Sequence, residues 1–297
     1  MKITVGVQTL QSPQLGETDP WAKFVERFTR EAPRQCDFIL LSEVEQEWGE
    51  LLDERARADL GMKALISPKP RGSACAVLYR PETVGEPTPR ILRDGEILHH
   101  DRTRTTVCGW ALAWWMLPVG SGAEEKTVPV GVCSFKFCPW SPDDARIAAA
   151  HAMTHPFQGG AFAVCGGDVN FPPADPGNPP PDWRSQSPFN RGQRALPGTA
   201  RGSNPLPNRS VAQQIIDKGW DDVAWELAQR TRDRSILRPT ARDGFERIDQ
   251  MYCTTAFTPA ITDYDTLQAP VGASDHHGLI AVFDLALAAY EANVIWT

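Results

Sequence analysis

The chain has 297 residues, a formal net charge of −7, a hydrophobic fraction of 41% and ten tryptophans. Its length suffices for a sizeable core, and since no run approaches about 18 apolar residues, the composition excludes a membrane helix. The acidic balance argues against a protein that binds nucleic acid strongly and nonspecifically over its whole surface.

The first part of the chain predicts strands that alternate with helices. A strand at residues 3–7 is followed by a helix from Asp19-Pro20, since proline suits the first helical position, and this helix ends at Pro33. A second strand at residues 36–41 leads into a charged amphipathic helix at residues 45–60.

Strands dominate the middle of the chain and helices are interspersed among them. The expected strands are at residues 63–67, 74–80, 91–99, 105–117, 128–137, 161–167, 250–254 and 279–283. The expected helices are at residues 141–155, 210–218 and 222–228, and residues 171–209 form an irregular insert rich in proline, glycine and asparagine. This pattern predicts an α+β fold with two packed sheets flanked by helices. No linker divides the chain, so we expect a single domain over residues 1–297.

A polar pair follows the strand at residues 161–167. The chain there reads Ala-Val-Cys-Gly-Gly-Asp-Val-Asn and ends at Asp168 and Asn170. Side chains two residues apart on a strand share a face, so these two are predicted to be presented together. A carboxylate can polarise water and an amide can hold an oxyanion; the alternative is a capped turn.

Acidic residues mark three other strand edges. Glu43 ends the second strand, Asp249 precedes the strand at residues 250–254, and Asp275-His276 precedes the last strand. Taken singly, each acid can be a solvated strand end, and a lone histidine is more often a core or surface residue.

The four strand-edge clusters, in this order, resemble the endonuclease/exonuclease/phosphatase (DNase-I-like) superfamily over about residues 2–285. The resemblance implies a four-layered α/β/β/α sandwich of two mostly antiparallel sheets. It also implies a phosphoester hydrolase that uses Mg²⁺ or Mn²⁺.

The resemblance assigns four catalytic roles. It implies that Asp168 activates the attacking water and that Asn170 binds the scissile phosphate. It also implies that Asp249 pairs with His276, with side chains about 2.6–3.2 Å apart, and that His276 stabilises charge on the phosphoryl oxygens.

A divalent metal is expected at Glu43, Asp275 and Gln8, since Mg²⁺ prefers carboxylate and other oxygen ligands. Two positions depart from the family. Gln8 stands where the family has asparagine. Phe135 stands at or near the position where the phosphatase and sphingomyelinase members carry a phosphate-binding histidine. We expect Lys136 to supply the missing substrate contact.

The insert contains a basic segment. Residues 184–209 hold five arginines and no acid or lysine. Arg191, Arg194 and Arg201 are predicted to bind a nucleic-acid backbone, with Trp183 and Phe189 stacking on bases. The alternative is a solvated loop whose arginines pair with the acidic body.

We therefore expect a metal-dependent phosphodiesterase that acts on nucleic acid, that is, a nuclease. The alternatives are a phosphatase or phospholipase-type enzyme on a small or lipid substrate, and a nucleic-acid-binding protein with weak catalysis. Seven scattered cysteines and no export signal predict a cytoplasmic protein, and no membrane partner is expected.

Overall fold

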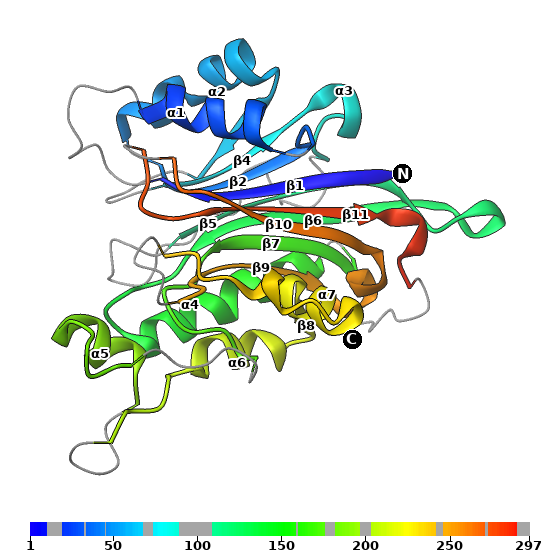
Figure 1. The fold of residues 1–297 in the computed structure, drawn as a ribbon. Helices are drawn as coiled ribbons and strands as arrows, with labels where there is room; N and C mark the ends of the chain where they lie inside the picture. The colour runs from blue at the N-terminus through cyan, green and yellow to red at the C-terminus, as the bar shows by residue number, and fades with distance from the viewer. Residues whose placement is uncertain are drawn as a thin grey trace.

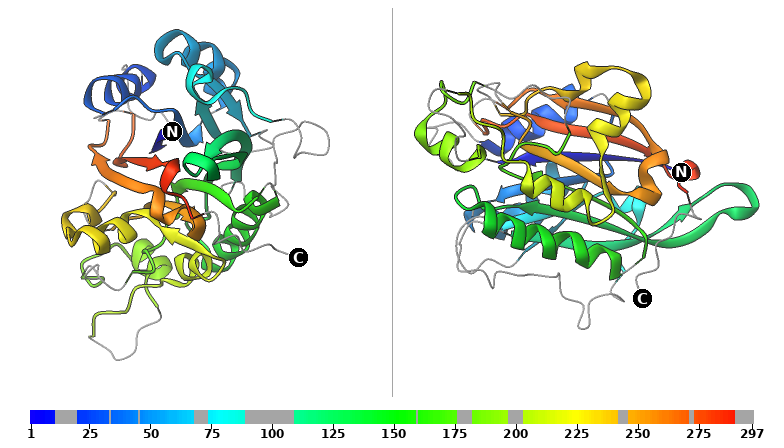
Figure 2. Two further views of the ribbon diagram at one scale, coloured as in Figure 1. Left: turned by 90° about the vertical axis from the view of Figure 1, so that its right-hand side faces the viewer. Right: turned by 90° about the horizontal axis from the view of Figure 1, so that it is seen from below.

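The computed structural model describes residues 1–10, 20–32, 34–44, 46–67, 74–88, 109–158, 160–175, 182–196, 203–241, 246–270 and 273–289. Two mixed sheets pack face to face, and helices cover the outer face of each (Figures 1 and 2). The predicted four-layered α+β sandwich is confirmed.

Within the described residues, the first sheet has six strands in the order β10-β11-β1-β2-β4-β3. Its strands are β1 (Lys2–Thr9), β2 (Phe38–Val44), β3 (Lys63–Ile66), β4 (Ala74–Tyr79), β10 (Ile261–Leu267) and β11 (Gly278–Asp284). Only β1 and β2 run parallel to each other, and the other neighbours are antiparallel.

The second sheet has five described strands in the order β5-β6-β7-β9-β8. They are β5 (Gly109–Val119), β6 (Lys126–Lys136), β7 (Phe162–Asp168), β8 (Trp220–Asp222) and β9 (Asp249–Thr254). Here β6 and β7 form the one parallel pair. Each sheet thus contains two adjacent strands whose carboxyl ends lie together.

Most of the helices lie in the outer layers. They are α1 (Pro20–Glu26), which continues as a π-helical turn (Arg27–Glu31), α2 (Gln46–Leu60), α3 (Pro81–Val84), α4 (Pro142–Thr154), α5 (Pro188–Arg194), α6 (Ser210–Ile216) and α7 (Val223–Thr231). Short 3₁₀ turns lie at Gly122–Glu124, His155–Gln158, Arg234–Leu237, Thr255–Ala260 and Leu285–Leu287.

Local sequence explains where the longer helices begin and end. The Ser141 side chain accepts a hydrogen bond from the backbone N–H of Asp144, and Pro142 occupies the first turn of α4. Helix α2 stops at Gly61, whose φ of 63° is a left-handed conformation that glycine adopts without strain.

Three apolar clusters hold the layers together. The largest lies between the sheets and includes Val5, Leu40, Trp115 and Val164. A second packs α1 and α2 on the outer face of the first sheet, and a third packs α4 and α6 on the outer face of the second. Helix α7 contributes Val223, Ala224, Leu227 and Ala228 to the cluster between the sheets.

Most predicted elements are present, but four were missed: α3, α5, β8 and β10. The strand β10 escaped prediction because it lies at a sheet edge and carries Asp263 and Asp265, a residue type that strands disfavour. Helix α5 lies inside the insert that was predicted to be irregular. The strand predicted at residues 91–99 lies outside the described residues.

Candidate active site

The carboxyl ends of β1, β2, β6 and β7 meet at one end of the sandwich. The Ser134 hydroxyl in β6 donates to the carbonyl oxygen of Leu41 in β2 at 2.6 Å. Asp168, at the end of β7, is the register partner of Asp249, at the start of β9. The topology therefore gathers side chains from both sheets at this edge.

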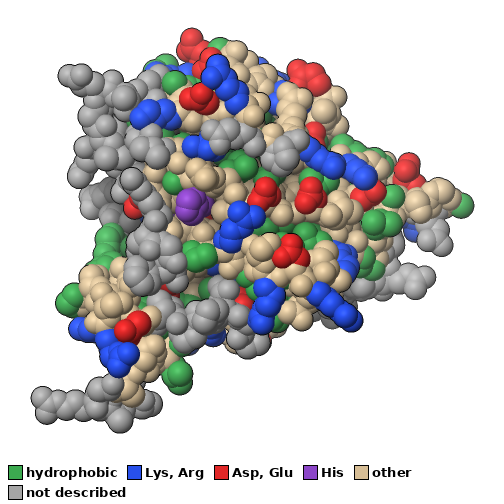
Figure 3. All heavy atoms as spheres, in the orientation of Figure 1, with side chains coloured by type: hydrophobic (Ala, Val, Ile, Leu, Met, Phe, Trp, Pro, Cys, Tyr) green, Lys and Arg blue, Asp and Glu red, His purple; other side chains and the backbone are tan. Residues whose placement is uncertain are grey.

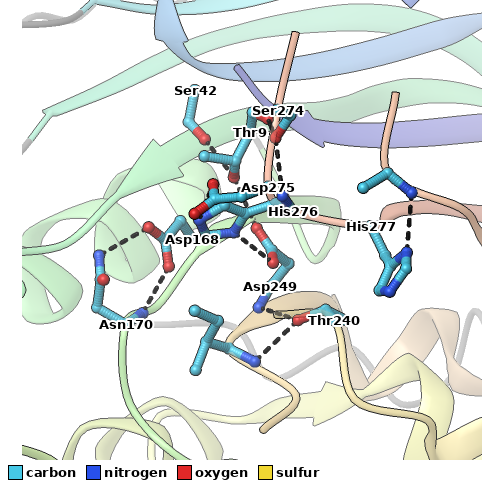
Figure 4. A network of polar contacts seen from close by, with 12 residues as sticks. Thr9, Ser42, Asp168, Asn170, Thr240, Asp249, Ser274, Asp275, His276 and His277 are labelled. Carbon is cyan, nitrogen blue, oxygen red and sulfur yellow. Dashed lines mark hydrogen bonds and ion pairs between the residues drawn. The ribbon is translucent and has the colours of Figure 1, made fainter. Parts of the chain in front are cut away.

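Asp249 and His276 form the central pair of the site (Figure 4). Asp249 Oδ2 lies 2.8 Å from His276 Nδ1, so the predicted contact is confirmed. The other carboxylate oxygen, Oδ1, accepts from the Thr9 hydroxyl at 2.6 Å, and the Asp249 N–H donates to Thr240 Oγ1 at 2.9 Å. The Ser274 hydroxyl accepts from the His276 N–H and donates to the Thr9 carbonyl. Both members of the pair are thus held by a neighbouring hydroxyl.

The pair is ionised at neutral pH. Burial by itself would lower the pKa of His276, but the charge and hydrogen bond of Asp249, with the charges of Asp168 and Asp275, raise this pKa to about 9. Burial would likewise raise the pKa of Asp249, and the opposing charge and hydrogen bond of His276 bring it below its ordinary value. His276 therefore presents an imidazolium whose Nε2 lies 3.5 Å from Asp275 Oδ1.

Asp168 is 1% exposed and is held by Asn170. The Asn170 backbone N–H donates to Oδ1 at 2.8 Å, and its side-chain Nδ2 donates to Oδ2 at 2.8 Å. Nδ2 also donates to the carbonyl oxygen of Phe137 at 2.9 Å. Both amide hydrogens are therefore used inside the protein, so in this geometry Asn170 positions Asp168 and has no N–H left for a phosphate.

Burial raises the pKa of Asp168, although the charges of His276, Lys136 and Arg194 act in the opposite direction. A raised carboxyl pKa suits a general base better than an ordinary one, because the base must hold a proton once it has accepted it.

The two glycines before Asp168 allow the sheets and strands to approach closely. A Cβ atom on Gly166 would lie 2.4 Å from Val7 Cγ2, and one on Gly167 would lie 1.8 Å from the carbonyl oxygen of Phe135. No side chain fits at either position, so the Gly-Gly pair is a packing requirement of the site.

Glu43 reaches the site because its strand is irregular. The β2–β4 pairing shifts register between Leu41 and Val44, and Glu43 has a left-handed φ of 58°. Its Oε1 contacts Lys136 Nζ, and this ammonium also lies 3.9 Å from Asp168 Oδ2. Lys136 is thus brought into the site as predicted, but as a partner of two carboxylates.

Gln8 does not join this group. Successive side chains along β1 point to opposite faces of the first sheet. Val7 lies in the cluster between the sheets, whereas Leu10 lies in the cluster under α1 and α2. Gln8 shares the face of Leu10, where its Nε2 donates to the carbonyls of Thr9 and His276. Thr9, the next residue, shares the face of Val7, because consecutive side chains of a strand lie on opposite faces of the sheet. Thr9 therefore occupies the position in the site that was predicted for Gln8.

Phe135 is placed by the same alternation. It belongs to the cluster under α4 and stacks on Phe137 with ring centroids 4.5 Å apart. Lys136 and Ser134, on either side of it, face the first sheet. His277 also lies outside the site, since its Nδ1 accepts from the Ala269 N–H at 2.8 Å.

A substitution pair tests the assignment of Thr9. Thr9→Val keeps the shape but removes the donor to Asp249, and we expect the free energy of unfolding to fall by about 1.5–3 kcal/mol, the usual contribution of a hydrogen bond to a charged group. Gln8→Met should change it by less than about 1.5 kcal/mol, since among the described residues Gln8 bonds only to neutral carbonyls and its Oε1 has no partner. Urea unfolding at pH 7 measures both; a larger loss in Gln8→Met would contradict the assignment.

The arginines of the insert are largely tied to the protein. Arg194 pairs with Glu246 at 3.3 Å, and both side chains are largely buried. Arg209 donates to the carbonyls of Pro173 and Asp175, which joins the two ends of the insert. Arg184 pairs with Asp182 at 2.9 Å. Arg194 thus pairs with the acidic body, as the alternative expects, whereas the contacts of Arg209 and Arg184 given above lie within the insert.

Arg191 remains exposed and makes no ion pair with a described residue, whereas Arg201 lies outside the described residues. Of the two predicted stacking residues, Phe189 is 47% exposed but Trp183 is 1% exposed. Trp183 is a buried anchor of the insert, so its predicted role in base stacking is wrong. Helix α5 lies at the same end of the sandwich as the site (Figure 1).

The site residues fit a hard divalent cation. Carboxylate oxygens are the ligands that Mg²⁺ and Mn²⁺ prefer, and the ligand atoms of Asp168, Asp249 and His276 lie within 4.8 Å of one another. Asp249 is bonded to the charged His276, whereas the hydrogen bonds to Asp168 described above come from the neutral Asn170, so Glu43, Asp168 and Asp275 are the better ligand set. Four carboxylates face two cations, Lys136 and His276, which leaves the site negative enough to attract a metal ion.

Comparison with known proteins gives the fold. No protein-family model matches the sequence. Similar solved structures include an endonuclease/exonuclease/phosphatase from Bacteroides vulgatus, with 12% identity, a TM-score of 0.60 and coverage of 96% of this chain and 99% of that chain. An AP endonuclease from Archaeoglobus fulgidus has 15% identity, a TM-score of 0.56 and coverage of 95% and 99%. TDP2 from D. rerio, complexed with a single-strand DNA product, has 12% identity, a TM-score of 0.55 and coverage of 95% and 99%.

The chain therefore has the endonuclease/exonuclease/phosphatase fold that its sequence resembles. One curated protein, hir1 from Aspergillus terreus, is 32% identical over a segment that covers 37% of this chain and 13% of hir1. The chain thus matches about an eighth of that protein. None of the described helices is both long and apolar enough to cross a membrane.

Proposed function

We propose that this protein is a divalent-metal-dependent phosphodiesterase and that its substrate is a nucleic acid. The observation that carries the proposal is the ionised Asp249–His276 pair beside the buried carboxylate of Asp168. On the same fold, similar structures are an AP endonuclease and a TDP2 bound to a DNA product.

In the proposed reaction one residue acts as a base and two cations stabilise negative charge. Asp168, oriented by Asn170, accepts a proton from the attacking water. The His276 imidazolium, held by Asp249, stabilises the charge that develops on the phosphoryl oxygens. Lys136, whose ammonium is 3.9 Å from Asp168 Oδ2, contacts the same phosphate.

A metal ion held by Glu43, Asp168 and Asp275 would polarise a phosphoryl oxygen and lower the charge on the leaving group. The protein contributes the fixed position of these carboxylates, two of which lie at strand ends in different sheets.

A substrate screen tests the proposed function. The purified protein is assayed on single-stranded, double-stranded and abasic DNA, on RNA, on bis(p-nitrophenyl) phosphate and on p-nitrophenyl phosphate, with Mg²⁺, Mn²⁺ or chelator. We expect metal-dependent cleavage of at least one nucleic acid, lost in Asp168→Asn. Folded protein without cleavage of any diester would contradict the proposal.

A small phosphoester is the second candidate substrate, because the cations of the described residues are not gathered into one surface. Three of the insert arginines are internally paired, and acidic and basic side chains mix over the face in Figure 3 without forming one basic surface. Cleavage of the p-nitrophenyl substrates alone would favour this candidate.

Arg191 offers a direct test of nucleic-acid binding. If it contacts a phosphate, Arg191→Ala should reduce the slope of log affinity against log salt by about 0.7–0.9. Fluorescence anisotropy with a labelled single strand measures the slope. Arg57→Ala, on α2 in the opposite helix layer, removes the same charge and should leave the slope unchanged. Equal slopes in parent and Arg191→Ala would show that the insert does not contact the backbone.

A further inference from the structure

Lys136 lies at the centre of the acidic site. Its Nζ contacts Glu43 Oε1 and is 3.9 Å from Asp168 Oδ2, and its side chain is only 8% exposed. One buried cation therefore neutralises part of a group of carboxylates that are the proposed metal ligands.

We propose that Lys136 and a divalent cation compete for Glu43 and Asp168. In the metal-free protein Lys136 is the resident cation of the site. When a metal ion binds, the Lys136 ammonium leaves these oxygens and becomes available to a substrate phosphate. The inference rests on the proposed function for its metal ion, and goes beyond it by making metal binding and substrate binding depend on one side chain.

Electrostatics favours the exchange. The Glu43 oxygen that contacts Lys136 cannot also coordinate a metal ion while the ammonium remains beside it, because two cations a few ångströms apart in a largely buried site repel strongly. Since lysine is a compact charge on a flexible stem, it can release the carboxylates without movement of the strand that carries it.

The strand geometry explains why Lys136 takes this place. Lys136 is the last residue of β6 and is the register partner of Asp168 in the parallel pair β6–β7. The bulge in β2 and the left-handed backbone of Glu43 bring the second carboxylate to the same ammonium from the other sheet. Without a cation, these carboxylates would repel each other at the point where the two sheets meet.

Calorimetric titration with Mn²⁺ tests the competition. Lys136→Met keeps an unbranched side chain that is one atom shorter and removes its charge, so the Kd for Mn²⁺ should fall by about tenfold or more, since a neighbouring unit charge at about 4 Å is removed. Lys2→Met is the matched control, because Lys2 is 58% exposed at the opposite end of β1 and pairs there with Asp284. Its Kd should match that of the parent.

Thermal unfolding in chelator and in Mn²⁺ gives a second measurement. In chelator, Lys136→Met should have a lower melting temperature than the parent. Addition of Mn²⁺ should raise the melting temperature of Lys136→Met by more than that of the parent, since ligand binding to the native state stabilises it. If Lys136→Met is unfolded in chelator, Lys136→Gln replaces it, and refolding of Lys136→Met by Mn²⁺ alone would itself support the proposal.

Each outcome has a distinct meaning. An equal or higher Kd in both Lys136 variants would overturn the competition and leave metal-dependent hydrolysis standing. A protein that binds no Mn²⁺, with or without Lys136, would overturn the competition together with the metal dependence of the proposed function. Hydrolysis is not used as a readout, so the two failures are separable.

Discussion

Replacing Asp249 with asparagine is expected to lower phosphodiester hydrolysis by about 10²- to 10⁴-fold, the range that a positioned acid–base group contributes. Asparagine preserves the shape but not the charge that keeps His276 protonated. It also keeps an oxygen for the Thr9 hydroxyl, so the fold should be retained. Steady-state kinetics on the best substrate from the screen measures the loss, and a variant within tenfold of the parent would show that the pair is structural.

The pH dependence of the same pair gives an independent check. In metal-free protein, NMR titration should place the His276 pKa at about 9, and Asp249→Asn should bring it down. His277 is an internal reference, because its pKa is lowered by burial and it lies outside the pair. A His276 that titrates near its ordinary pKa in both proteins would refute the ion pair.

The sign of the stability effect follows from the direction of each shift. The folded pKa of His276 is raised, so its contribution is complete below about 6.5, the unfolded value, and is lost as the pH rises through about 9. The folded pKa of Asp249 is lowered, so its contribution is present above about 3.9 and is lost as the pH falls through the folded value. The parent should therefore exceed Asp249→Asn in stability mainly between about pH 4 and pH 9.

Replacing Arg247 with methionine should destabilise the protein strongly. The Arg247 side chain is fully buried and bonds to Asp175 at 2.6 Å and Asp222 at 2.8 Å. Removing it takes away the buried cation that is bonded to both carboxylates, a change that costs about 3–5 kcal/mol. Because Arg247 lies two residues before Asp249 and joins β8 to the start of the insert, the loss should also reduce activity.

Arg238→Met is the matched control. Arg238 pairs with Asp265 at 3.2 Å, but both side chains are about half exposed, so its loss should cost less than about 1 kcal/mol. Urea unfolding measures both variants. The deficit of Arg247→Met should shrink at lower pH, because Asp222, whose pKa is already raised by burial, can then be protonated. If Arg247→Met loses no more free energy of unfolding than the control, the buried ion pairs of Arg247 do not stabilise the fold and the prediction is wrong.

The local sequence was sufficient to predict the fold and to predict that Glu43, Asp168, Asp249 and His276 lie at sheet edges. Acids at the ends of apolar strands are readable without a structure, because a buried strand that stops at a carboxylate must present it at a sheet edge. The order of Glu43, Asp168, Asp249 and His276 along the chain carried the resemblance, and the Asp249–His276 contact at 2.8 Å agrees with it. Gly166 and Gly167 likewise marked the place where strands approach most closely.

The tertiary structure alone decided which atoms each side chain meets. Alternation along β1 says that Gln8 and Thr9 face opposite sides, but only the pairing of β1 with its neighbours says which side is the site. Lys136 meets Glu43 because a bulge in another sheet turns that carboxylate toward it, and Arg194 meets Glu246 because the insert folds back on the approach to β9. Such pairs join residues far apart in the chain, and their partners depend on how sheets and insert pack in space, which spacing within one strand does not encode.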